Sequence, residues 1–158
     1  MGLVAFTATK AQSTATATAT ATVITPISIS KNTDMNFGNL AVASGTGGTL
    51  VLAPAGTRSS TSGVTLPSTA GTVSAATFTV TGTGSSTYAI TLPGSVTLTH
   101  SGGVQTMSAG SFTSNPSVTG VLSSGTQDIA VGATLTVAAG QLAGVYTSGN
   151  FNVTVNYN

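Results

Sequence analysis

The sequence predicts an all-β protein, an antiparallel sandwich or barrel preceded by a long N-terminal strand. Alanine and threonine alternate from Thr14 to Val23, which is the two-residue period of a β-strand. The rest of the chain consists of short β-prone runs separated by Gly, Ser, Pro and Asn clusters. Charged helix formers are nearly absent, since the 158 residues include no Glu and only two Lys. Regularly spaced strands with turn signals are typical of sandwiches and barrels.

Residues 1–11 have features of the end of a secretory signal peptide. Leu3 to Phe6 is a short apolar run, and small residues precede a cut after Ala11, although no basic region comes before the run. If the cut is made, the mature chain begins at Gln12. If the segment is retained, Leu3, Ala5 and Phe6 are further apolar side chains that a groove on another molecule can accept.

Residues 12–23 form the second predicted unit, a strand with one small apolar face and one threonine face. The apolar face carries Ala15, Ala17, Ala19, Ala21 and Val23, and its phase continues to Ile27 and Ile29. Such a long free strand suits addition to another molecule's sheet. A strand that folds back on its own domain, an ice-binding face and a disordered linker are the other interpretations.

Residues 24–158 are long enough for one domain with its own core. The clusters at Gly45–Gly48, Ser59–Gly63 and Gly82–Ser86 predict turns or loops, and Ala138–Leu142 predicts a short helical turn. The predicted strands are Val23–Ser30, Thr49–Leu52, Ala76–Thr81, Thr87–Leu92, Val96–Thr99, Gln105–Phe112, Ser117–Leu122, Gln127–Val131, Thr134–Val137 and Phe151–Tyr157.

The last of these strands has the clearest alternation in the domain. Its apolar side chains, Phe151, Val153, Val155 and Tyr157, occupy alternate positions, and Asn or Thr fills the positions between them. This pattern predicts a strand with one face in the core and one in solvent.

Composition argues against several classes of function. The chain has three basic and two acidic residues, so nothing in its charge favours binding to nucleic acid or to an anionic membrane. No stretch approaches the ~20 apolar residues of a membrane-spanning helix. There is no cysteine, so the sequence offers no disulfide.

Residues that could serve in catalysis or metal binding are also scarce. We therefore expect that the protein is not an enzyme and binds no cofactor or metal. His100, the one histidine, lies at a strand end, where an exposed loop histidine is expected. Of the two carboxylates, Asp34 is expected to bond backbone in a turn and Asp128 to be an edge-strand charge. With the acids far from the histidine in sequence and no GxSxG motif, a catalytic triad is not expected.

Taken together, these features resemble subunits of Gram-negative pili assembled by the chaperone–usher route. The terminal strand Phe151–Tyr157 with its penultimate aromatic, Gly144 fourteen residues before the end, and the alternating N-terminal run are similar to that family's pattern. The domain also resembles an exported bacterial pilin-like family of unassigned function. That second resemblance rests on Asn36-Phe37-Gly38-Asn39-Leu40, Gly47-Gly48-Thr49, Phe78–Gly82 and the Gly144–Tyr157 region.

The resemblance implies an immunoglobulin-like β-sandwich with an N-terminal donor-strand extension. It implies a structural subunit of an extracellular pilus or fimbria, a homopolymer in which each subunit donates its N-terminal strand to a neighbour. Ala15, Ala17, Ala19, Ala21 and Val23 would be the interface residues. The implied partners are a periplasmic chaperone and an outer-membrane usher, and the implied location is the surface of a Gram-negative cell. A self-contained adhesin or carbohydrate-binding sandwich module is the alternative.

Overall fold

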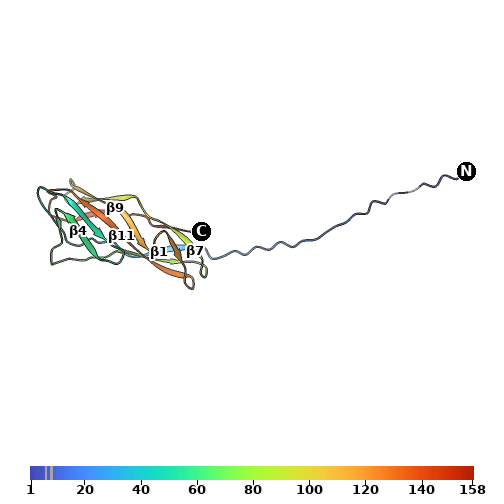
Figure 1. The fold of residues 1–158 in the computed structure, drawn as a ribbon, viewed down its shortest axis with the longest axis horizontal. Helices are drawn as coiled ribbons and strands as arrows, with labels where there is room; N and C mark the ends of the chain where they lie inside the picture. The colour runs from blue at the N-terminus through green and yellow to red at the C-terminus, as the bar shows by residue number, and fades with distance from the viewer. Residues whose placement is uncertain (6, 8) are drawn as a thin grey trace.

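The computed structural model describes residues 1–5, 7 and 9–158. Figure 1 shows an elongated body of strands with a long extended segment projecting from one end. Residues 9–27, called here the N-terminal arm, contain no strand, and all of them except Ile27 are exposed. The C-terminus lies at the same end of the body as the base of the arm (Figure 1).

The described residues form thirteen strands and no helix, as the sequence predicts. The strands are β1 (Ser28–Thr33), β2 (Ala41–Val42), β3 (Gly48–Leu52), β4 (Arg58–Ser62), β5 (Val64–Thr65), β6 (Ala76–Thr81), β7 (Thr87–Thr91), β8 (Ser95–His100), β9 (Thr106–Asn115), β10 (Thr119–Val121), β11 (Thr126–Val137), β12 (Tyr146–Ser148) and β13 (Thr154–Tyr157).

The long strand β11 organises the larger of the two layers. In the eight-stranded antiparallel sheet the order is β1-β6-β11-β9-β8-β12. On its other side, β11 pairs with β6 through its first half and with β3 through its second half, and β4 pairs with β3. β11 therefore joins the two halves of the body. In the order β1-β6-β11-β9-β8-β12, the edge strands are β1 and β12.

The second layer consists of two small sheets that cover the same face of the large one. The three-stranded sheet β10-β7-β13 and the two-stranded sheet β2-β5 lie over different halves of it. Two clusters of buried side chains fill the space, and Met35 and Phe112 pack against both. The chain is thus an all-β, immunoglobulin-like antiparallel sandwich, which confirms the predicted fold class.

Several predicted elements differ from the observed ones. Ser59–Gly63 was expected to be a turn, but residues 58–62 form β4, whose Ser and Thr hydroxyls give no apolar alternation. The two strands predicted around Gly132 are one continuous strand, β11, because Gly132 packs against the backbone of Leu52 and Pro54, where a side chain has no room. Residues 138–142 make no helical turn, and the final strand begins at Thr154 rather than at Phe151.

The predicted strand Val23–Ser30 is also shifted, since β1 begins at Ser28. Ile27 and Ile29 are half-buried and pack against the core cluster, whereas Val23 is fully exposed. The apolar phase of the arm therefore continues into the core face of β1, and the domain begins where that phase first reaches the body.

Candidate functional site: an open apolar groove

An open groove of about 1330 Å³ runs along the body between two segments far apart in sequence. The first wall is formed by residues 33–42, which begin at the end of β1. The second wall is formed by residues 141–152, which contain β12. These walls continue the two edge strands of the large sheet. The groove therefore lies between segments that extend from the two edges of the large sheet.

The floor of the groove is the core face of the large sheet. It is made by apolar side chains of β6, β8, β9 and β11. Met107 and Leu135 are buried there, whereas Val96, Leu98 and Phe112 are only half-buried. Apolar side chains left partly wet at the centre of a sandwich mark a surface that is stabilised when it is covered.

The first wall is built by the motif Asn36–Leu40. Asn36 pairs with Ser74 through both backbone groups, and its side-chain oxygen accepts a bond of 2.8 Å from the Gly38 amide. Gly38 has a φ of 69°, and a Cβ there would meet Val73 at 2.7 Å, so glycine is required on both counts.

Arg58 of β4 fixes this wall from outside. Its Nη1 donates to the carbonyl oxygens of Phe37 at 2.7 Å and of Asn39 at 2.9 Å. The Phe37 side chain itself belongs to the buried core cluster, so Arg58 holds the backbone of a core residue. Sequence reasoning did not select Arg58, because its partners lie about twenty residues earlier and no local pattern joins them.

The second wall is held by His100 and Gln105. The two ring nitrogens of His100 contact the Gly102 amide (2.9 Å) and the Ala143 carbonyl oxygen (3.2 Å), so Nδ1 accepts and Nε2 donates. The ring lies edge-on to Tyr146, with centroids 4.9 Å apart. Gln105 Oε1 accepts from the Leu142 amide at 2.6 Å and lies 3.0 Å from the Tyr146 hydroxyl. His100 is therefore half-buried and structural, not the exposed loop residue that was expected.

A glycine permits this packing. A Cβ on Gly144 would overlap the His100 ring, so any larger residue would displace either the wall or the ring. This gives a physical reason for the glycine on which the sequence resemblance partly rests.

The family model described as "Domain of unknown function (DUF4402)" matches residues 27–157. The chain belongs to this family. The matched range begins where the arm reaches the body, so it covers the sandwich, both walls and the floor of the groove. No curated protein and no solved structure matches the chain.

The two carboxylates of this DUF4402 domain bond to different partners. Asp34 forms an ion pair of 2.7 Å with Lys31, on a highly exposed stretch at the rim of the groove, instead of the expected backbone bond. Asp128 accepts a bond of 2.6 Å from the Thr79 hydroxyl. It lies on the solvent face of β11, at a position that pairs with β6 alone, because the pairing with β9 begins at Ala130. Asp128 is therefore at a local edge of an otherwise central strand, in line with the expected edge-strand charge. In the described part of the chain, no three His, Cys, Asp or Glu residues lie close enough to hold a metal ion. The described residues include no helix that is long and apolar enough to cross a membrane.

The predicted interface residues lie on the arm, away from the groove of their own DUF4402 domain. Ala15, Ala17, Ala19, Ala21 and Val23 are all exposed in extended chain. Leu3 is fully exposed, and Phe6 lies outside the described residues.

The predicted core strand lies beside the groove. Val155 is buried, whereas Phe151, Val153 and Tyr157 are half-buried and pack against the core, with the polar residues between them exposed. Phe151 lines the groove and contacts Phe112 of its floor, with ring centroids 5.3 Å apart. Residues 149–153 belong to no strand, and they follow β12 along the second wall.

Proposed function

We propose that the chain is a structural subunit of an extracellular pilus or fimbria. Each subunit inserts the N-terminal strand of its own chain into the groove of the next, so that identical copies form a homopolymer. This function involves no catalysis, cofactor or metal. The observation that carries the proposal is the pairing of an open apolar groove with an exposed, extended arm of alternating pattern in one molecule.

The arm supplies a run of suitable length. The alternating run from residue 15 to 23 spans about 30 Å when extended, at ~3.3 Å per residue. β12 is an edge strand beside the groove, so an inserted strand can pair with it and place every second side chain over the floor.

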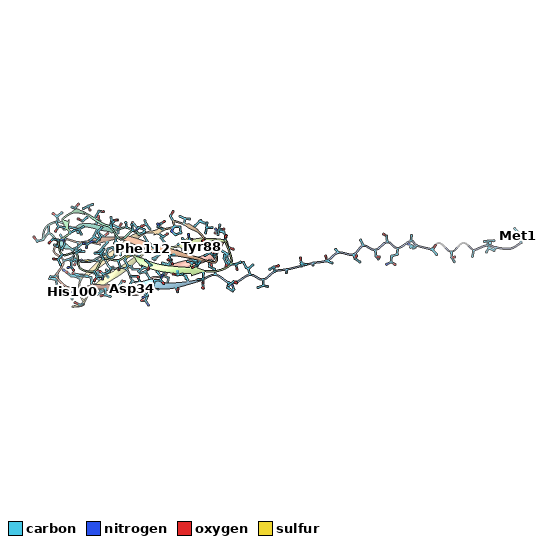
Figure 2. All side chains as sticks on the ribbon, turned by 90° about the horizontal axis from the view of Figure 1, so that it is seen from below. Met1, Asp34, Tyr88, His100 and Phe112 are labelled. Carbon is cyan, nitrogen blue, oxygen red and sulfur yellow. The ribbon has the colours of Figure 1, made fainter. Side chains whose placement is uncertain are left out.

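The ends of the molecule suit a head-to-tail polymer. Figure 2 shows His100 at the end of the body opposite the arm, called here the far pole. Tyr146 in the second wall pairs with His100, so the groove reaches this pole. Donor and acceptor are thus different surfaces, and such heterologous contacts build open filaments when the rotation does not close.

The same geometry favours partners before assembly. A groove with half-buried apolar side chains, bordered by the edge strand β12, is an aggregation hazard in a free subunit. A periplasmic chaperone would cover it, and an outer-membrane usher would direct assembly at the surface of a Gram-negative cell. The surface of the chain, with three basic and two acidic residues, offers little charge repulsion as an alternative protection.

The phase of the donor strand gives the sharpest test. The alanine face continues to Ile27 and Ile29, which face the core, so the alanines should face the neighbour's floor and the threonines solvent. Ala17→Asp or Ala19→Asp should then abolish filaments, because each buries an unpaired carboxylate. Thr18→Asp and Thr20→Asp, the matched controls, should assemble. Filament yield by electron microscopy measures the effect.

The outcomes separate the alternatives. Loss at the alanine positions alone supports insertion in this phase, and loss at the threonine positions alone reverses the phase. Equal loss at all four positions contradicts a one-sided strand. If the unaltered protein is secreted only as monomers, the polymer proposal is wrong and a self-contained surface module becomes the better interpretation.

A further inference from the structure

Hydrogen bonds join the base of the arm to the body, and they could not be predicted from the sequence. The Tyr157 hydroxyl donates to the Thr25 carbonyl oxygen at 2.8 Å and accepts from the Thr83 amide at 2.7 Å. The Thr83 hydroxyl donates to the same Thr25 oxygen at 3.2 Å. One backbone carbonyl of the arm therefore receives two donors, one from β13 and one from the turn between β6 and β7.

The residues around this contact are suited to it. A Cβ on Gly82 would overlap the Tyr157 hydroxyl, so glycine leaves the space that the hydroxyl occupies. Pro26 restricts Thr25 to extended conformations and has a fixed φ of its own. Immediately after it, Ile27 packs against the core. The chain direction at the exit is thus set by a stiff dipeptide with a doubly bonded carbonyl on one side and a core contact on the other.

The direction of exit matters because the arm is long enough to reach its own groove. The 24 residues before Thr25 span up to about 80 Å when extended. To dock in its own groove, the arm would have to reverse at its base and run back along the body toward the far pole. The Tyr157 and Thr83 hydroxyls hold the last part of the arm before the body, where a reversal would leave the most chain for the return.

We infer that Tyr157 and Thr83 form a clamp on Thr25 that directs the arm away from its own body and disfavours docking in its own groove. The inference rests on the proposed function, since it assigns Tyr157 a positioning role in choosing a second copy over self-docking. The Tyr157 ring packs against the core and its hydroxyl holds the arm, so the two roles can be separated by removing the hydroxyl alone.

The test measures the position of the arm within single molecules. Because the chain has no cysteine, Thr18→Cys and Ser101→Cys place one spin label on the arm and one beside His100 at the far pole. Labelled full-length protein is diluted into excess unlabelled protein, so that only distances within one molecule are recorded. In the unaltered background we expect one long-distance population.

Two clamp variants are compared with a matched control. Tyr157→Phe and Thr83→Val should each increase a short-distance, self-docked population roughly two- to tenfold, the change expected for one net hydrogen bond. Thr61→Val removes a comparable hydroxyl pair, Thr49–Thr61 at 2.7 Å between β3 and β4, and should leave the distances unchanged. Thermal unfolding of each variant identifies any loss of the fold, and Thr83→Val carries the test if Tyr157→Phe does not fold.

The clamp is overturned if neither variant changes the distances, or if the short population already dominates in the unaltered protein. Its failure is distinguishable from failure of the proposed function. Filaments with unresponsive distances contradict the clamp alone. Distances that respond in a protein that never forms filaments support the clamp and contradict polymerisation.

Discussion

Tyr88 illustrates how single residues set the geometry of the core. It is fully buried in the half of the body nearer the arm (Figure 2), where its hydroxyl donates to Gln127 Oε1 at 2.6 Å. The same oxygen accepts from the Val121 amide at 2.9 Å, which ties β10 to β7 and β11. Gly120 lies opposite Tyr88, and a Cβ there would overlap the phenol. The sequence places Tyr88 on a predicted strand but does not predict a partner that lies 39 residues away.

The buried hydroxyl of Tyr88 should make the free energy of unfolding decrease as the pH rises into the alkaline range. Burial raises the pKa of Tyr88 above its ordinary value of 10.0. A raised pKa in the folded state means that the contribution of this group is complete below about pH 10 and is lost as pH rises toward the folded pKa. The free energy of unfolding should therefore fall more steeply above pH 10 in the unaltered protein than in Tyr88→Phe.

Urea unfolding at about pH 8 and at about pH 11 tests this. Below pH 10 the phenylalanine variant should be less stable by ~1 kcal/mol, because Gln127 loses one donor. The difference between the two proteins should shrink at the higher pH. A constant difference would mean that the pKa of Tyr88 is the same in the folded and unfolded states, which would contradict a pKa raised by burial.

At the scale of elements, the sequence predicts strands well where apolar residues alternate and poorly where packing decides. β6 matches its predicted bounds because Ala76, Phe78 and Val80 alternate with threonines. β4 was missed because it is paired through backbone and hydroxyl groups and contributes little to the core. β12 is three residues long and is held by His100 and Gln105, so its formation depends on contacts that are distant in sequence.

The first wall of the groove should depend on Arg58. Arg58→Met keeps much of the apolar stem but leaves the carbonyls of Phe37 and Asn39 without their donors. Hydrogen bonds from a charged group contribute roughly 1.5–3 kcal/mol, so a loss of this order is expected in urea unfolding. Lys31→Met is the matched control, because its ion pair with Asp34 is exposed and should contribute under about 1 kcal/mol. Equal effects of the two substitutions would contradict this role of Arg58.

At the scale of the whole molecule, the sandwich could be predicted and the groove could not. Composition and turn spacing favour a sandwich, and this prediction does not require knowing which strands pair with each other. The groove arises from which strands end the large sheet, and β1 and β12 are separated by more than a hundred residues. The candidate donor residues follow from a local alternation, whereas their acceptor depends on the complete topology.

A chain lacking residues 1–23 should keep its fold and bind the missing segment in trans. The Thr25 contacts, β1 and both core clusters remain. A peptide of residues 12–23 should raise the melting temperature, since a ligand at a hundred times its Kd stabilises by about 2.7 kcal/mol. A peptide of the same composition without the alternation is the control. Equal shifts with both peptides, or none with either, would count against the groove as a strand acceptor.

The placement of the arm has a mechanical consequence for the proposed fibre. The arm leaves the body along its long axis (Figure 1), and the groove runs in the same general direction toward the far pole. Tension on the fibre would therefore pull each inserted strand lengthwise, which loads its backbone hydrogen bonds together rather than one after another. Because β11 runs through both halves of the body, the load would cross each subunit without depending on one small sheet. A fibre of this design would resist stretching even though its alanine side chains fill little of the groove.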